Sequence, residues 1–146
     1  MTRPLDATER RLSDLLSLIA VLHIVSGLAL PLLLPLWPAL IAAMPANAGF
    51  WAAVFGPTVA SWGVLMFVLV RHGLRARQRW ASDALLLALM VWAPLDSLLC
   101  WRAGFPAAIA LNAVAAASIA VPLWMLRRHW ASPSTTSRSQ SAGVSP

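Results

Sequence analysis

Four long apolar runs, separated by short polar or charged segments, form the main pattern along the chain. The runs cover residues 15–36, 50–70, 84–101 and 107–126. A helix that crosses a bilayer needs about 20 consecutive apolar residues, because each residue adds only about 1.5 Å of length. The pattern therefore predicts an all-α fold, an integral membrane bundle of four transmembrane helices. We expect helices over about 14–36, 50–71, 83–101 and 106–127, within one domain that covers residues 1–131.

A Ser-Asp pair precedes two of the four runs. Ser13-Asp14 stands before the first run and Ser82-Asp83 before the third. A serine hydroxyl satisfies free N–H groups at a helix start, and an acid there is favoured by the helix dipole. The two pairs therefore predict the starts of the first and third helices.

Two segments outside the runs have distinct compositions. Residues 37–49 carry no charge and contain Pro38 and Pro45, and we expect them to lie at the membrane interface. They include a small-residue sequence resembling a signal-peptide cleavage site. The preceding run is longer than the 7–15 residues of a signal peptide, however, so we expect it to be retained as a span. Residues 132–146 are rich in Ser, Thr and Pro, which predicts a disordered cytoplasmic tail.

Composition supports a membrane protein and argues against a nucleic-acid-binding one. The chain is 60% hydrophobic and 11% charged, whereas soluble domains are about 45–50% apolar and about 25% charged. Its net charge of +6 comes from short basic clusters between apolar runs, the usual pattern of a membrane protein. All eleven basic residues are arginine. Together with abundant Ala, Leu and Pro, this usage indicates a bacterial genome rich in G and C, and hence a bacterial inner membrane.

The arginines also predict the orientation of the chain. The segment before the first run holds three, residues 71–79 hold four, and the segment after residue 126 holds three. The two remaining loops hold none and one, which is Arg102. Because cytoplasmic loops carry the excess of basic residues, we expect both termini and the middle loop to be cytoplasmic.

Six of the eight tryptophans fall where the interfaces are expected, and two do not. An indole favours the interface because it has an apolar body and a donor that prefers water. The interfacial set is Trp37, Trp51, Trp101, Trp80, Trp124 and Trp130. Trp62 and Trp92 lie near the middle of their runs, so we expect them to pack inside the bundle.

The two halves of the chain match at corresponding places. Residues 48–53 read AGFWAA and residues 103–108 read AGFPAA, so five of six positions agree. Two tandem helical hairpins in a parallel repeat would explain the match. Chance similarity between Ala-rich helices explains it equally well, and both interpretations stay open.

Asp96 is the leading candidate for a functional residue. It lies six positions before Arg102, roughly 9 Å inside the outer end of the third helix. An acid in hydrocarbon costs about 2.5–3.5 kcal/mol on insertion scales, and therefore usually faces the bundle interior or water. The alternative is a structural acid, hydrogen-bonded to a neighbouring helix.

Three further polar residues and one histidine complete the candidate intramembrane site. Asn112 and Thr58 are expected at the depth of Asp96, and a short turn should bring Asn112 against Asp96. His23 and Ser61 are expected near the midplane. These side chains would form either a cavity that opens outward or hydrogen bonds between helices. A midplane histidine can relay protons, although it more often bonds a backbone carbonyl.

Small residues at four-residue spacing predict close helix packing. Ala52, Gly56 and Ala60 form one such row, and Ala116 and Ala120 continue another that begins at Asn112. Such rows drive helix association in lipid, within one chain or in a homo-oligomer, or with another membrane protein.

Known catalytic and cofactor signatures are missing. A single cysteine, Cys100, excludes an intramolecular disulfide, and no nucleotide loop or zinc-spaced cluster is present. We therefore expect no metal and no cofactor. The favoured interpretation is a non-enzymatic membrane subunit or scaffold that acts by helix packing. One alternative is a small proton-coupled permease or exporter using Asp96, and another is an intramembrane lipid-modifying enzyme using Asp96, Asn112 and His23.

Overall fold

All regular structure is helical in the residues that the computed structural model describes, which are 5–36, 38, 48–104 and 106–131. The elements in chain order are α1 (Ala7–Leu33) with the 3₁₀ turn η1 (Leu34–Leu36), α3 (Ala48–Val68) with the π-helical turn η2 (Leu69–Leu74), α4 (Arg79–Arg102) and α5 (Pro106–Ala131). Four helices are long and apolar enough to cross a membrane. The predicted all-α class and the four spans of a multi-pass membrane protein are confirmed.

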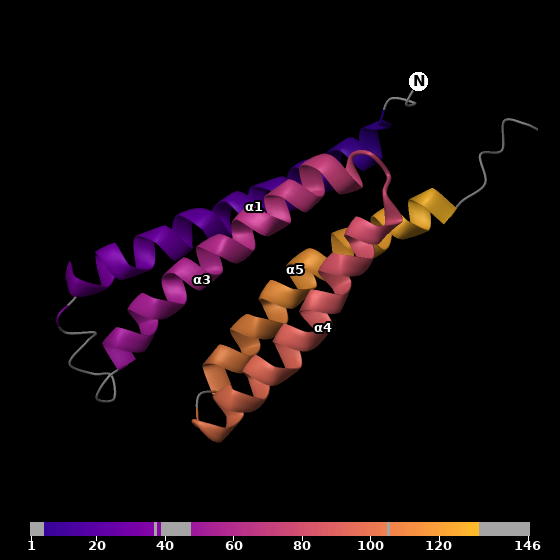
Figure 1. The fold of residues 1–146 in the computed structure, drawn as a ribbon. Coiled ribbons are helices and arrows are strands. Elements are labelled where there is room, and N and C mark those ends of the chain that lie inside the picture. The colour runs from indigo at the N-terminus through magenta and orange to yellow at the C-terminus, as the bar shows by residue number, and fades with distance from the viewer. Residues whose placement is uncertain (1–4, 37, 39–47, 105, 132–146) are drawn as a thin grey trace, which may run out of the picture.

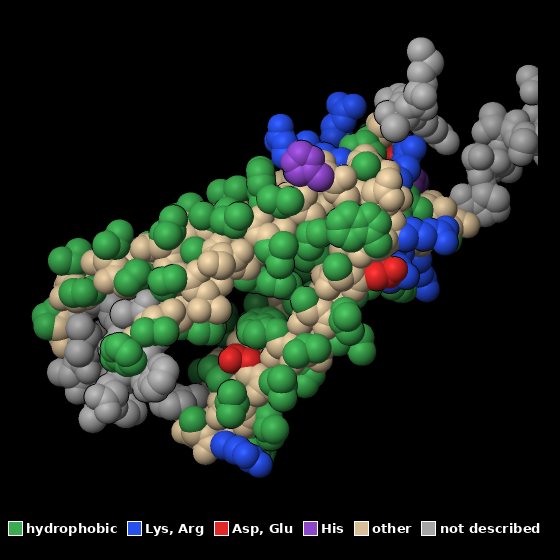
Figure 2. All heavy atoms as spheres, viewed as in Figure 1, with side chains coloured by type: hydrophobic (Ala, Val, Ile, Leu, Met, Phe, Trp, Pro, Cys, Tyr) green, Lys and Arg blue, Asp and Glu red, His purple; other side chains and the backbone are tan. Residues whose placement is uncertain are grey.

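The helices form two antiparallel pairs that meet at one end and diverge toward the other (Figure 1). One pair is α1 with α3, and the other is α4 with α5. Contacts of α1 with α5 and of η2 with α4 join the pairs. We call the joined end the arginine-rich end, because Figure 2 shows most basic side chains gathered there. The opposite end, where α4 passes into α5, is called the open end.

The expected start of the first helix is wrong by about two turns. The backbone N–H of Glu9 donates to Asp6 Oδ1 at 2.9 Å, and the N–H of Asp6 donates to Glu9 Oε2 at 3.0 Å. These reciprocal bonds form a capping box that starts α1 at Ala7. Ser13 is buried inside the helix and caps nothing.

The third helix also begins before its expected cap. Its first residue is Arg79, and the preceding Gln78 is extended and gives no side-chain cap. Ser82 is buried in the first turns of α4, where the helix packs against η2. The capping box of Asp6 and Glu9 therefore sets the start of α1, and the start of α4 is packed against η2. The expected interfacial segment 37–49, except Pro38 and the first residues of α3, and the expected disordered tail 132–146 lie outside the described residues.

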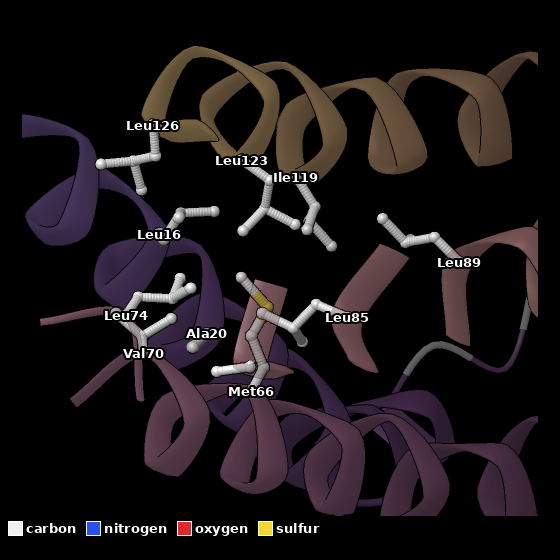
Figure 3. Packing of buried hydrophobic residues seen from close by; sticks show 11 residues of the cluster. Leu16, Ala20, Met66, Val70, Leu74, Leu85, Leu89, Ile119, Leu123 and Leu126 are labelled. Carbon is white, nitrogen blue, oxygen red and sulfur yellow. The ribbon is translucent and has the colours of Figure 1, made fainter. Parts of the chain in front are cut away.

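The buried apolar core occupies the half of the bundle near the arginine-rich end. In Figure 3 side chains from both pairs point toward one another around Met66 and Leu85. The cluster comprises Leu16, Ala20, Met66, Val70, Leu74, Ala81, Leu85, Leu89, Ile119, Leu123 and Leu126. Large apolar side chains also cover the outside of the helices, as expected for surfaces that face lipid (Figure 2). Trp62 and Trp92 are partly buried against the core, which confirms the expectation that they pack inside the bundle.

Small residues bring α1 and α3 into backbone contact. Gly56 and Ala60 are buried at this interface and face Gly27 of α1. A Cβ added at Gly27 would lie 2.5 Å from the carbonyl oxygen of Gly56, and one at Gly63 would lie 2.8 Å from that of Ala20. The predicted row on α3 therefore packs within the chain.

The remaining members of the two predicted rows are Ala116 and Ala120 on α5 and Ala52 on α3. Ala116 and Ala120 are partly buried and pack against the core from α5. Ala52 belongs to α3, but the surroundings of its side chain lie outside the described part of the structure.

Candidate functional site

A cavity of about 560 Å³ lies between the two helix pairs, and all four helices contribute to its wall. We call it the inter-hairpin cavity. Figure 2 shows the corresponding hollow between the diverging pairs. The cavity exists because the pairs are joined mainly by the core near the arginine-rich end, so their other halves do not close on each other.

Aromatic and apolar side chains form the floor of the cavity. Trp62, Trp92 and His23 each lie one helical turn beyond a core residue of the same helix, toward the open end. Ile119 belongs to both the core and the cavity wall. The floor is therefore the layer of the core that lies nearest the open end. Phe55 extends the aromatic wall along α3.

Asp96 and Asn112 meet in the wall of this cavity. Asp96 lies one helical turn from Trp92 of the floor, toward the open end. Asn112 Nδ2 donates to Asp96 Oδ2 at 2.6 Å, which is the contact expected from the short turn between α4 and α5. The Cys100 thiol donates to the same oxygen at 3.9 Å. Asp96 Oδ1 has no hydrogen-bond partner among the described residues. One carboxylate oxygen is thus held by the protein, and the other is left to the cavity.

Asp96 differs from the other four acids of the chain in having no basic side chain as a partner in the described structure. The others all form ion pairs near the arginine-rich end, which are Asp6–His129, Glu9–Arg77, Asp14–Arg75 and Asp83–Arg127. Arg102, on the same helix as Asp96, forms no ion pair with it. The inter-hairpin cavity therefore contains a carboxyl group whose charge this part of the protein does not balance.

Thr58 also lines the cavity, and His23 belongs to its floor. His23 Nδ1 lies 2.8 Å from the carbonyl oxygen of Ile19. A carbonyl only accepts, so Nδ1 carries the proton and Nε2 of the neutral ring is an acceptor. His23 therefore makes the simpler of the two expected interactions, a hydrogen bond to a carbonyl of its own helix. Its ring also borders the cavity.

Ser61 is not part of the site. Its side chain is exposed, and its hydroxyl donates to the carbonyl oxygen of Pro57 at 2.8 Å. Residue counting placed Ser61 at the right depth but could not place it on a face of α3. Sequence reasoning also missed Cys100 and Phe55 in the wall. Cys100 follows Asp96 by four positions, a spacing that puts two residues on one helix face and was available as a signal.

A second polar cluster ties three segments together at the arginine-rich end. The buried Glu9 carboxylate accepts bonds from Arg77 Nε at 2.8 Å, Arg77 Nη2 at 2.5 Å and Trp130 Nε1 at 3.1 Å. The hydrogen bond to Glu9 raises the pKa of the Arg77 guanidinium. The Glu9 backbone N–H, followed by the His129 side chain, lowers the pKa of Asp6.

The same cluster contains three residues of metal-ligand type. The ligand atoms of Asp6, Glu9 and His129 lie within 4.8 Å of one another. Both oxygens of Glu9 already accept bonds from Arg77, and Asp6 is held by His129 and by the capping box. The three residues are therefore held by protein partners, and the cluster links α1 to α5 and to the segment that precedes α4.

The inter-hairpin cavity therefore combines an apolar, aromatic wall with one uncompensated acid, and it is the candidate site. Comparisons of this chain with protein-family models, with curated proteins and with solved structures found no match, so its function is argued from this geometry.

Proposed function

We propose that this protein is a small membrane carrier for hydrophobic organic cations, which it exchanges for protons at Asp96. The observation that carries the proposal is the carboxyl group of Asp96, which faces an apolar cavity without a cationic partner in the described structure. Three of the remaining acids pair with arginine, and Asp6 pairs with His129.

The charge of Asp96 limits what the cavity can bind. A carboxylate in an apolar medium is unstable unless it is paired or neutralised. Two neutral states are available to Asp96, protonation and the binding of a cation from outside. The two states exclude each other at one carboxyl group, and this competition is the chemical basis for exchange of a cation against a proton. Asn112 holds the carboxyl group in place through Oδ2 in either state.

The cavity wall favours an organic cation over a metal ion. Phe55, Trp62 and Trp92 present aromatic surface, and most of the remaining wall is aliphatic. Aromatic rings attract cations through their quadrupoles, and apolar walls bind hydrophobic substituents. A metal ion would need several oxygen ligands, whereas the carboxylate, one amide and one hydroxyl are spread over three helices here.

The joined and open ends suggest how the carrier moves. The pairs are held together near the arginine-rich end by the core and by α1–α5 contact, and they diverge elsewhere. Rocking of one pair against the other would close the cavity and open the opposite side, which is the usual form of alternating access. We infer from the arginine distribution that the open end faces outward across a bacterial inner membrane, with both termini cytoplasmic.

Titration of the purified protein in detergent with tetraphenylphosphonium tests the proposal. This cation has a counterpart of nearly the same shape and opposite charge, tetraphenylborate, which separates charge recognition from hydrophobic partition. We expect saturable binding of the phosphonium above the level in empty micelles, accompanied by proton release. Asp96→Asn should weaken binding about tenfold or more, because the charge contact in the cavity wall is lost, and should abolish proton release.

Asp83→Asn is the matched control for this experiment. It makes the same change on the same helix, but Asp83 is exposed and pairs with Arg127 outside the cavity. We expect it to bind the phosphonium as the wild type does. Equal binding of both probe ions, or unchanged binding by Asp96→Asn, would overturn the carrier proposal. Such a result would favour the alternative of a membrane subunit acting by helix packing.

Cys100 provides an independent test of access and orientation. It is the single cysteine of the chain, it is partly buried, and its side chain lies in the cavity wall. A membrane-impermeant maleimide added to intact cells should label the wild type but not Cys100→Ser, and phosphonium should slow the reaction. Labelling that occurs only in inverted vesicles would reverse the proposed orientation. No labelling from either side would contradict a water-accessible cavity.

A further inference from the structure

We propose that a second pocket, at the arginine-rich end between α4 and α5, binds the phosphate headgroup of an anionic phospholipid. The pocket has a volume of about 410 Å³. Its lining includes Arg79, Leu86, Trp124, Arg127, Arg128 and Trp130. We call it the arginine pocket. It shares no residue with the inter-hairpin cavity, and the proposal does not depend on the carrier function.

Three guanidinium groups, of Arg79, Arg127 and Arg128, line the pocket. Arg127 pairs with Asp83 at 2.8 Å, and both side chains are about half exposed. Arg79 forms none of the ion pairs of the described structure, and Arg128 stacks on the Trp124 ring at 3.7 Å. One guanidinium group can donate two parallel hydrogen bonds to two oxygens of a phosphate, so this lining suits a phosphate group.

The rest of the lining indicates that the phosphate belongs to a lipid. Leu86 follows Arg79 by seven positions, so the pocket extends about 10 Å along α4, from a charged helix start into an apolar span. Trp124 is 52% exposed on the neighbouring apolar surface of α5. Basic pockets between helices at the cytoplasmic boundary bind acidic lipid headgroups, and the apolar part of such a pocket receives the acyl chains. A free phosphate ion would not use the apolar part of the lining around Leu86.

Native mass spectrometry of the detergent-solubilised protein with added lipids tests the site. We expect retained adducts of phosphatidylglycerol and weak or no adducts of phosphatidylcholine, which has a similar acyl region and no net charge. Arg79→Ala should weaken phosphatidylglycerol binding about tenfold, since one charge-assisted contact is removed. Arg79→Ala combined with Arg128→Ala should weaken it further. A thermal melt of each variant shows whether the protein remains folded.

The matched control is Arg10→Ala combined with Arg71→Ala, which removes the same charge from exposed residues at the same end, outside the pocket. This control should retain wild-type binding of phosphatidylglycerol. Equal loss in the control and the pocket variant would mean that charge acts without a defined site, and would overturn the proposal. Equal binding of the two lipids would overturn it as well. Displacement of the lipid by millimolar inorganic phosphate would show that the pocket recognises the free ion instead.

Discussion

Gly27→Leu is expected to separate α1 from α3 and to cause the largest loss of stability of any single substitution considered for this chain. The nearest atoms to an added Cβ are backbone atoms of Gly56 and Ala60, with the Gly56 carbonyl oxygen at 2.5 Å. Backbone atoms of a packed helix have no rotamer into which they can move. The two helices must therefore shift apart along their interface, which also disrupts the contact between Gly63 and Ala20.

The size of this effect follows from overpacking in protein cores. Inserting atoms into a packed core typically costs about 1–3 kcal/mol when side chains can rearrange. Because only backbone is available to yield here, we expect the free energy of unfolding to fall by about 3 kcal/mol or more. Denaturation in mixed micelles, followed by circular dichroism, measures the change.

Ser26→Leu is the matched control for Gly27→Leu. It introduces the same side chain at the adjacent position of α1, where Ser26 is exposed. Its effect should stay within about 0.5 kcal/mol, as for most surface substitutions. If Gly27→Leu unfolded at the wild-type denaturant concentration, the close packing of α1 on α3 would be contradicted.

Arg77→Ala is expected to cause the second largest loss, about 3 kcal/mol of unfolding free energy. Glu9 is buried, and both of its carboxylate oxygens accept from Arg77. Removing the guanidinium leaves a buried carboxylate whose remaining bonds come from Trp130 and the backbone N–H of Asp6. Alanine is preferable to glycine in this test because Arg77 has a φ of 55°, and glycine would also relieve the backbone cost of that conformation.

A double-mutant cycle with Glu9→Gln isolates the interaction. Glu9→Gln combined with Arg77→Ala should be more stable than the sum of the single effects predicts, with a coupling energy of about 0.5–3 kcal/mol. Arg71→Ala, at an exposed arginine of the same end, should have little effect. Additive single effects would show that Glu9 and Arg77 do not stabilise each other in the folded protein.

These two predictions concern the parts of the fold that shape the inter-hairpin cavity. The Gly27 contact holds α1 against α3, and the Glu9–Arg77 pair ties the start of α1 to the segment before α4. Both act outside the cavity wall, so neither substitution touches Asp96. We expect Gly27→Leu and Arg77→Ala to lose cation binding together with folding, and Asp96→Asn to lose cation binding while it stays folded. This difference would separate the structural residues from the residue that binds the cation.

The sequence by itself determined the helical class, the four spans and several depths along them. Span length and the short turn between α4 and α5 were sufficient to predict that Asp96 and Asn112 meet, because adjacent antiparallel helices joined by a short turn must pack together. The same reasoning predicted that Trp62 and Trp92 pack inside the bundle, since they lie too deep for an interface.

Only the tertiary structure decided which face of each helix is turned inward. Lipid is as apolar as a protein core, so membrane helices carry no clear polar stripe to mark their outer side. This explains why depth alone placed Ser61 in the site although it does not line the cavity, and why the sequence did not reveal Gly27 as the partner of Gly56. Ser13 and Ser82 do not act as caps because contacts distant in sequence bury them. The Asp6–Glu9 capping box that starts α1 is local, and its spacing was available as a signal in the sequence. The sequence likewise does not show that Asp96 differs from the other acids. Those acids pair at the arginine-rich end with residues that are close in space, and spacing along the chain does not reveal such pairs.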